Sequence, residues 1–321
     1  MKNKFDPHYS IGIDIGGTKI AFVLTDQNGL EKSSYRLDTL PEQGANAVIQ
    51  RLVQGIEYLM QDMDDLIAGI GIGCPGLIDS QNGIVHLAAN LNWNDFPLVA
   101  ELKKKMKLDL PIYLENDVRA AALGERVFGA AKNLDNFVYI AIGTGLGACA
   151  IHNQQVIYGH NFVAMEVGHV SLDPNGRPCN CGNKGCVERY VSGSGLIDGL
   201  HEYYADYPES SLNLEATTYD ILQEAQKEDP LALRLLDEAG EALGIVFAWC
   251  VMILNPSVFV IGGGIGQSAK NWLIPRAKEE MQRRALTQAY DGLEFRISEV
   301  ESTAIGASAL VWHYRQQEGL N

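Results

Sequence analysis

Long apolar runs are missing from this sequence. The longest, GIVFAWCVMIL from Gly244 to Leu254, falls well short of the roughly 20 residues that a membrane-spanning helix requires. The N-terminal stretch MKNKFDPHYS also lacks the apolar segment of a secretion signal. We therefore expect a soluble cytoplasmic protein, and its 321 residues are enough to form two domains.

Basic residues are also scarce. The chain has 25 Lys and Arg against 40 Asp and Glu, which gives a formal net charge of -15, and KKK at positions 103–105 is its largest basic cluster. Affinity for nucleic acid depends on clustered Lys and Arg side chains that neutralise the phosphate backbone. Nucleic acid is therefore not an expected partner.

Disulfide bonds are not expected either, because a cytoplasmic compartment keeps thiols reduced. Three of the six cysteines, Cys74, Cys149 and Cys250, stand alone in apolar or glycine-rich surroundings and are predicted to be small buried hydrophobic residues. The other three lie close together in EVGHVSLDPNGRPCNCGNKGCVE, which spans residues 166–188. Their spacing points to a specific site.

This segment contains the pattern H-x9-C-x-C-x4-C, formed by His169, Cys179, Cys181 and Cys186. One nitrogen and three thiolates suit tetrahedral zinc, and four protein ligands are typical of a structural site. Turn formers such as PNG and NKG let a short loop fold around an ion. A redox pair or three unrelated thiols are the alternatives. Zinc would also fix the two flanking carboxylates, Glu166 and Glu188.

A glycine turn is predicted near the N-terminus. The stretch YSIGIDIGGTKIAFVLTD, from Tyr9, predicts two strands joined by a tight turn at Gly16 and Gly17. Dinucleotide-binding loops and P-loops instead lead into a helix, and a P-loop ends in GK[ST]. The formal G-x-G-x-x-G match GIGCPG, at positions 71–76, contains Pro75 and leads toward another turn, so we interpret it as a chance match.

The same pattern of strand, glycine turn and strand returns in NFVYIAIGTGLGACAIHNQQVIYG, from Asn136, which indicates two related halves. Backbone N–H groups of such turns can approach phosphate oxygens, Asp14 can hold a hydrated magnesium ion, and Thr18 or Thr144 can donate a hydroxyl. Hairpins without a ligand are the alternative. A third glycine run, VFVIGGGIGQ, follows a predicted strand, where an adenine could lie on the backbone. The residues predicted to bind the nucleotide are Asp14, Gly16, Gly17, Thr18, Lys19, Gly143, Thr144, Gly145, Gly262, Gly263 and Gly264.

Between the two halves, PIYLENDVRAAALGERVFGAA predicts a strand that ends at Asn116 and Asp117, followed by a helix. Asp117 could serve as the N-cap of that helix. Alternatively, its carboxylate could accept the proton of an attacking hydroxyl, which is the base role in phosphoryl transfer. Further along, Asp229–Pro230 predicts a helix start, and the small residues of STAIGASAL, from Ser302, predict a helix packed closely against the first domain.

The motifs DIGGTK, GCPG, END, GTGLGA and EVGH, the last leading to CNCGNKGCVE, resemble those of the ROK family (repressor, open reading frame, kinase), whose enzymes are sugar kinases. The match runs in order from about Tyr9 to Trp312. It implies an α/β protein with the duplicated actin-like, or ribonuclease-H-like, ATPase fold, in which two lobes flank a central cleft. The small domain would comprise residues 1–116 and the C-terminal helix at about 302–321, and the large domain, with the zinc loop, residues 117–301.

The resemblance also implies roles for individual residues. Asp117 would be the catalytic base that activates the sugar hydroxyl. His169 would contact both zinc and the sugar through its two ring nitrogens, so that the metal loop orients the substrate without taking part in the chemistry. The chain departs from the family pattern at Arg119, where Asn is usual, and at Ala148, where glycine is usual. The residues that would bind the sugar are Asn116, Asp117, Gly145, Glu166, His169 and Glu188.

The segment NLNWNDFPL and the C-x-C-G-x-x-G-C-x-E loop are most similar to those of ROK glucokinases. We therefore predict ATP- and Mg2+-dependent phosphorylation of glucose at its 6-hydroxyl by a homodimer with structural zinc. The alternatives are an N-acetylmannosamine, N-acetylglucosamine or fructose kinase, a sugar-sensing repressor, and a zinc-stabilised interaction module. A repressor would carry a DNA-binding segment ahead of the first glycine turn, where about a dozen residues precede Asp14, and an inactive module would lack Asp117.

Overall fold

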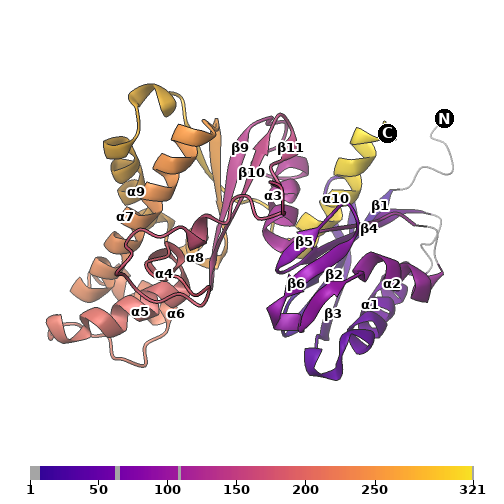
Figure 1. Cartoon of the computed structure of the whole chain (residues 1–321), viewed down its shortest axis with the longest axis horizontal. Helices are drawn as coiled ribbons and strands as arrows, with labels where there is room; N and C mark the ends of the chain where they lie inside the picture. The colour runs from indigo at the N-terminus through magenta and orange to yellow at the C-terminus, as the bar shows by residue number, and fades with distance from the viewer. Residues whose placement is uncertain (1–7, 62–65, 108–109, 320–321) are drawn as a thin grey trace. The chain divides into compact units, whose positions relative to one another are not determined.

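The computed structural model describes residues 8–61, 66–107 and 110–319 (Figure 1). Most of the N-terminal stretch MKNKFDPHYS, in which no secretion signal is expected, lies outside the described residues. The contacts divide the chain into two units. The first comprises Met1–Leu134, Tyr158–Ala164 and Glu299–Asn321, and the second comprises Asp135–Ile157 and Met165–Ser298. The chain therefore leaves the first unit and returns to it twice.

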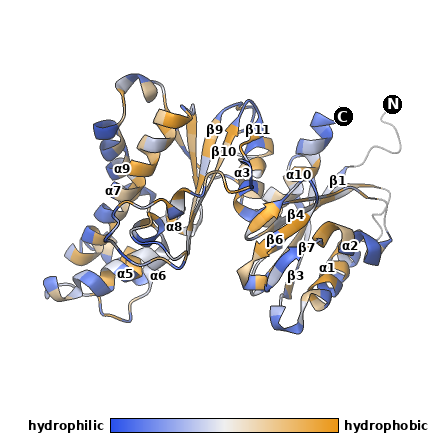
Figure 2. Ribbon diagram, viewed as in Figure 1, coloured by the Kyte–Doolittle hydropathy of each residue, from blue (hydrophilic) through white to orange (hydrophobic). Residues whose placement is uncertain are grey.

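The first unit is built on a five-stranded sheet. In spatial order its strands are β3 (Glu31–Asp38), β2 (Lys19–Asp26), β1 (Tyr9–Ile15), β4 (Ile67–Cys74) and β8 (Ile112–Asn116). β1, β2 and β3 form an antiparallel meander, whereas β4 and β8 run parallel to β1. Every position of β4 is buried, as expected of a central strand with both faces covered. The helices in Figure 2 carry both hydrophobic and hydrophilic residues, as expected of helices with one buried face.

Helices cover this sheet and connect its strands: α1 (Ala45–Met60), α2 (Leu98–Met106), α3 (Asp117–Val127) and α10 (Thr303–Gln317). A small antiparallel sheet of β5 (Leu77–Asp79), β6 (Ile84–Ala88) and β7 (Trp93–Phe96) follows β4. α10 packs directly on β1 and β4. The approach is so close that a Cβ at Gly12 or Gly71 would lie 1.9 Å from a carbonyl oxygen of α10. The close packing predicted for STAIGASAL is thus confirmed.

The second unit repeats this architecture. In spatial order its strands are β11 (Gln155–Val156), β10 (Leu146–His152), β9 (Phe137–Ile142), β12 (Val258–Gly262) and β13 (Glu294–Ile297). β9, β10 and β11 form an antiparallel meander, and β12 and β13 run parallel to β9. The two sheets share one strand order and one set of directions, so the predicted duplication is confirmed.

The helices of the second unit are α4 (Glu188–Val191), α5 (Gly193–Tyr203), α6 (Thr218–Gln226), α7 (Pro230–Ile253), α8 (Gly264–Ser268) and α9 (Lys270–Arg284). α7 begins at Pro230 with Asp229 as its N-cap, as predicted. The long apolar run lies at its C-terminal end, where Phe247 and Val251 are buried in the core of the unit. Among the described residues, no helix is long and apolar enough to cross a membrane.

The predicted domains differ from the two units of the structure mainly in where they place the helix α3. The predicted small domain ends at Asn116, whereas α3 belongs to the first unit, where it packs against α10. At this contact, a Cβ at Gly124 would lie 2.6 Å from the Cα of Gly306. Both divisions return the C-terminal helix to the N-terminal part of the chain.

Candidate functional site

The first glycine turn joins β1 to β2. The Gly16 N–H donates to the carbonyl of Lys19 over 2.9 Å, and the Thr39 hydroxyl donates to the Gly16 carbonyl over 2.7 Å. A Cβ at Gly16 would lie 2.9 Å from the Lys19 carbonyl oxygen, which explains the requirement for glycine. Thr18 and Lys19 are exposed. The turn is thus fixed in shape while its tip faces solvent, as a ligand-binding turn requires.

Asp14 and Asp117 lie at the carboxyl ends of two strands in the first unit. Asp14 is near the end of β1, and Asp117 begins α3 directly after β8, with β4 between the two strands. Burial, followed by the negative charge of Asp117, raises the pKa of Asp14 from 3.8 to about 7. A pair of interacting carboxylates favours a proton or a cation beside it, and magnesium prefers such oxygen ligands.

Asn116, and not Asp117, is the N-cap of α3. Its side-chain oxygen accepts the N–H groups of Val118 and Arg119 over 3.0 and 3.3 Å, and its amide donates to the Gly76 carbonyl over 3.2 Å. The N-cap interpretation of Asp117 is therefore wrong, because the preceding residue already satisfies the first N–H groups of the helix. The GIGCPG segment runs through β4 toward β5 and does not enter a helix, as expected.

The other two glycine runs lie next to each other in the second unit. Residues 143–145 form the turn between β9 and β10, and the run after β12 includes Gly263, which has a φ of 79°. A Cβ at Gly263 would lie 2.3 Å from the carbonyl oxygen of Ile142, the last residue of β9. Within the described part of the chain, no heavy atom lies within 4 Å of a Cβ added at Gly143 or Gly264. The structure thus brings these predicted nucleotide-binding residues together beside open space.

Glu188 lies against the second glycine turn. One carboxylate oxygen accepts the Leu146 N–H over 2.9 Å and would lie 2.7 Å from a Cβ at Gly145. The turn at Glu166–His169 also packs against the start of β10, since a Cβ at Gly168 would lie 2.3 Å from the Leu146 carbonyl oxygen. Both polar side chains of that turn are exposed. Most of the predicted sugar-binding residues of the second unit therefore gather around the start of β10.

The four predicted metal ligands form a compact cluster. Their ligand atoms lie within 4.8 Å of one another. The sulfurs of Cys181 and Cys186 are 3.6 Å apart, and the sulfur of Cys179 lies 3.7 Å from Nδ1 of His169. Ligand atoms around tetrahedral zinc, with Zn–S bonds near 2.3 Å, are roughly 3.8 Å apart, so the donor set and its spacing fit zinc. The remaining three cysteines form no disulfide bond and are buried, as predicted: Cys74, Cys149 and Cys250.

A family model described as the ROK family matches residues 10–313. The chain belongs to the ROK family. The predicted family is confirmed, and so is the duplicated actin-like ATPase fold, which the solved ROK sugar kinases share. Of the two departures from the ROK pattern, Ala148 is buried in the hydrophobic core of the second unit, and Arg119 is buried in the first unit.

Relatives of this ROK chain include both kinases and repressors. A glucokinase of Halalkalibacterium halodurans is 34% identical over 321 residues, which cover 96% of this chain and 95% of that protein. A xylose repressor of Bacillus subtilis is 33% identical over 308 residues, which cover 94% of this chain and 77% of the repressor. Among solved structures, a ROK family glucokinase from Streptomyces griseus, in complex with glucose and AMPPNP, has a TM-score of 0.77 and is 28% identical, with 94% of this chain and 98% of that chain covered.

Arg177, which sequence reasoning did not single out, holds the cysteine loop against α5 and α7. Its guanidinium forms salt bridges of 2.7 Å with both Glu202 and Glu238, and it donates to the carbonyl of Arg189 over 2.9 Å. It also stacks on Tyr190, 4.6 Å from the ring centroid. In the sequence, Arg177 is a charged residue among turn formers. This local pattern does not reveal its partners, one of which is 61 residues away.

Proposed function

We propose that the protein is an ATP-dependent sugar kinase that phosphorylates the 6-hydroxyl of glucose. The observation that carries this proposal is the pair of interacting carboxylates, Asp14 and Asp117, at the carboxyl ends of strands in a sheet that also carries a glycine turn. Open α/β sheets bind their ligands at this edge. The 34% identity to the glucokinase of H. halodurans supports the same class of reaction.

Asp117 is the general base of the proposed mechanism. Its carboxylate accepts the proton of the 6-hydroxyl while the hydroxyl oxygen bonds to the γ-phosphorus of ATP, and the bond from that phosphorus to the bridging oxygen breaks, so that ADP leaves with the electron pair. By capping α3, Asn116 fixes the backbone that carries Asp117. The residues proposed to contact the sugar are Asn116, Asp117, Gly145, Glu166, His169 and Glu188.

The glycine turns are proposed to bind the phosphates of ATP through backbone N–H groups that no side chain obstructs. Magnesium bound with ATP would neutralise charge on the phosphates, and Asp14 would hold it. The raised pKa of Asp14 is consistent with this role, because a nearby cation favours the charged carboxylate. The residues proposed to bind ATP and magnesium are Asp14, Gly16, Gly17, Thr18, Lys19, Gly143, Thr144, Gly145, Gly262, Gly263 and Gly264.

Zinc is proposed as a structural ion in the second unit. The four ligands are His169, Cys179, Cys181 and Cys186. A set of four protein ligands leaves no open position for a substrate, so the ion would stabilise the loop and take no part in phosphoryl transfer.

A coupled assay with ATP and Mg2+ tests the substrate. It compares glucose with mannose, fructose, N-acetylglucosamine and N-acetylmannosamine. We expect glucose to give the highest kcat/KM, because a site built for the hydroxyl at carbon 2 disfavours a bulky acetamido group by roughly 10- to 200-fold. A higher kcat/KM for another sugar would keep the kinase and overturn glucose as its substrate.

The role of Asp117 has a direct test. Asp117→Asn retains the shape of the side chain and removes the proton acceptor, so kcat should fall by ~10²-fold or more while glucose binding, measured by calorimetry, persists. Asp291→Asn, at an exposed position of the second unit, is the matched control. Near-normal turnover by the Asp117 variant would remove this residue from the mechanism.

A sugar-responsive regulator is the second candidate function. The specific support is the 33% identity to the B. subtilis xylose repressor across 94% of this chain. A ligand that binds the folded state raises its melting temperature by mass action. A chain that one of these sugars stabilises, but that transfers no phosphate from ATP to any of them, would favour the regulator over the kinase.

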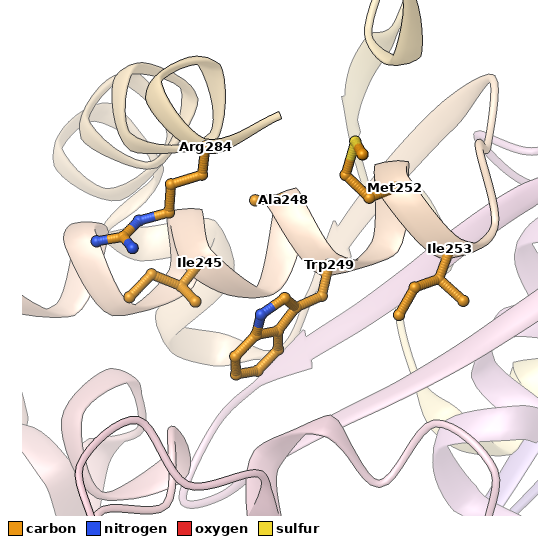
Figure 3. A pocket seen from close by; sticks show the side chains of 6 residues that line it. All are labelled: Ile245, Ala248, Trp249, Met252, Ile253 and Arg284. Atoms are coloured by element: carbon orange, nitrogen blue, oxygen red, sulfur yellow. The ribbon is translucent and has the colours of Figure 1, made fainter. Parts of the chain in front are cut away.

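We also propose a homodimer that forms through an apolar surface near the C-terminal end of α7. Figure 3 shows its lining residues, Ile245, Ala248, Trp249, Met252, Ile253 and Arg284. Ile253 is 78% exposed and Met252 is 47% exposed, and a neighbouring cavity of about 350 Å³ includes Val170. Apolar side chains gathered in this way mark an interaction surface.

Charge favours a second copy of the chain as the partner. With a net charge of -15, two copies repel each other over most of their surfaces. The residues that line this α7 surface include no acidic side chain, so two copies that meet there bring no lining carboxylates together. Light scattering should report a dimer, which Ile253→Glu converts to a monomer and Leu214→Glu, at an exposed hydrophobic position outside this surface, does not. A monomeric wild type, or a dimeric Ile253→Glu variant, would overturn this interface.

A further inference from the structure

Two buried charged residues of the first unit, Glu115 and Arg119, flank the proposed base Asp117 in the chain. Glu115 lies at the end of β8, and Arg119 lies in the first turn of α3, so that Asn116 and Asp117 stand between them in the chain. Glu115 is 0% exposed and Arg119 is 4% exposed. Buried charges require partners, and here the partners come from a segment about forty residues further along.

Tyr158 and Phe162 supply these partners. Glu115 accepts the Tyr158 hydroxyl over 2.7 Å and the Asn116 N–H over 2.9 Å. The Arg119 guanidinium lies 3.4 Å from the Glu115 carboxylate and 5.2 Å from the centroid of the Tyr158 ring, and it donates to the Phe162 carbonyl. Burial raises the pKa of the Glu115 carboxyl, so its charged form depends on these donors.

The segment Tyr158–Ala164 contains no helix or strand that would fix its shape. One backbone hydrogen bond closes it, from the Ala164 N–H to the Tyr158 carbonyl over 3.1 Å. Phe162 has a φ of 59°, a left-handed conformation that a bulky residue adopts only with support from its surroundings. The Arg119 guanidinium binds the carbonyl of this same residue. From Ala164 the chain continues directly through Met165 to Glu166.

We infer that Arg119 is a positioning residue that ties the segment Tyr158–Ala164 to the N-terminal turn of α3 and thereby orders the chain leading to Glu166 for sugar binding. This inference rests on the proposed sugar kinase function. A buried ion pair adds little net stability, because desolvation offsets its Coulombic attraction, but it can select one conformation. The loss of Arg119 should therefore weaken sugar binding more than it slows the chemical step at Asp117.

Arg119→Met retains the length of the side chain and removes its donors. We expect the KM and Kd for glucose to rise by roughly 10- to 100-fold, while kcat and the KM for ATP stay within about threefold. Arg119→Lys keeps one donor for the Phe162 carbonyl and should recover part of the affinity. Arg126→Met is the matched control, because Arg126 lies on the same helix beside His313, and it should leave the KM for glucose unchanged.

Tyr158→Phe provides a second variant if Arg119→Met does not fold. It removes only the hydroxyl that Glu115 accepts, and it should raise the KM for glucose in the same direction by a smaller factor. A KM that either folded variant leaves at the wild-type value, with only the melting temperature lowered, would reduce the cluster to a structural role and overturn the inference.

Hydrogen exchange separates this inference from the proposed kinase function. Backbone amides of residues 158–166 should exchange faster in Arg119→Met than in Arg126→Met, whether or not the wild type phosphorylates glucose. A wild type that phosphorylates no sugar, combined with faster exchange in this segment, would overturn the kinase and keep the positioning role. Equal exchange in the two variants would overturn the positioning role alone.

Discussion

Gly71→Ala would place a methyl group where the C-terminal helix lies directly on the first sheet. Gly71 belongs to β4, and a Cβ there would lie 1.9 Å from the carbonyl oxygen of Ala307 in α10. Carbon and oxygen atoms in ordinary contact are roughly 3.5 Å apart, so the strand and the helix would have to separate by about 1.5 Å. Because the clashing oxygen is part of the backbone, no change of rotamer can relieve it.

The expected magnitude follows from this geometry. Overpacking costs about 1 to 3 kcal/mol, and a backbone clash belongs at the upper end, less about 0.4 to 1 kcal/mol gained by replacing glycine. The free energy of unfolding should therefore fall by ~2 kcal/mol, and the Tm by roughly 4 to 8 °C. Gly73→Ala is the matched control on the same face of β4, because its Cβ would lie 3.6 Å from side-chain carbons of Ala120 and Thr303, an ordinary contact.

Scanning calorimetry and urea unfolding measure both variants. Tryptophan fluorescence adds a local probe, because Trp312 lies in α10 itself. Gly73→Ala should remain within about 1 kcal/mol of the wild type. A Gly71→Ala protein that melts together with Gly73→Ala would refute the close packing of α10 on β4.

Three other perturbations have defined outcomes. Burial, followed by the charge of Arg126, lowers the pKa of His313 from 6.5 to about 4, so the unfolded chain binds a proton before the folded chain does as the pH falls. The wild type should therefore lose up to ~3 kcal/mol more stability than His313→Gln between pH 6.5 and pH 4, and parallel stability curves would contradict this. Metal analysis should find about one zinc per chain, and Cys181→Ser should lower the Tm and raise the KM for glucose together, whereas fully active metal-free protein would exclude the zinc site. Asp14→Asn should raise the Mg2+ concentration that gives half-maximal rate without weakening glucose binding, and an unchanged magnesium requirement would remove Asp14 from the magnesium site.

The glycine turns and the cysteine loop could be predicted because each depends on residues close together in the chain. Gly16 and Gly17 join two consecutive strands, so alternating apolar residues around a glycine pair are sufficient to identify the hairpin. Cys179 and His169, which lie beside each other in the cluster, are only ten residues apart in sequence. Duplication of the strand order could be recognised for the same reason, because each half carries its own glycine turn.

Contacts between distant segments could not be predicted from one sequence. Glu125 is a buried carboxylate that accepts the N–H groups of Ala130, Glu299 and Val300 over 2.7, 3.0 and 3.0 Å, and the last of these residues is 175 positions away. The sequence shows only that Glu125 is a charged residue within a helix, and it does not show that the side chain is buried or which groups it binds. The sequence alone likewise does not show that Asn116, and not Asp117, is the N-cap of α3, because both residue types are favoured there and only backbone geometry decides.

Glu188 explains how a metal cluster can affect a reaction in which the ion takes no part. Cys186, one of the proposed ligands, precedes Glu188 by two residues, and Val187 between them is fully buried, so a shift of the backbone at the thiol would also shift the backbone that carries the carboxylate. The same carboxylate accepts the Leu146 N–H at the second glycine turn. Displacement of the cysteine loop would therefore also displace Glu188, a proposed sugar contact, and disturb the glycine turn at Gly145. Loss of zinc should then weaken sugar binding while leaving Asp117, the proposed base, in place in the other unit.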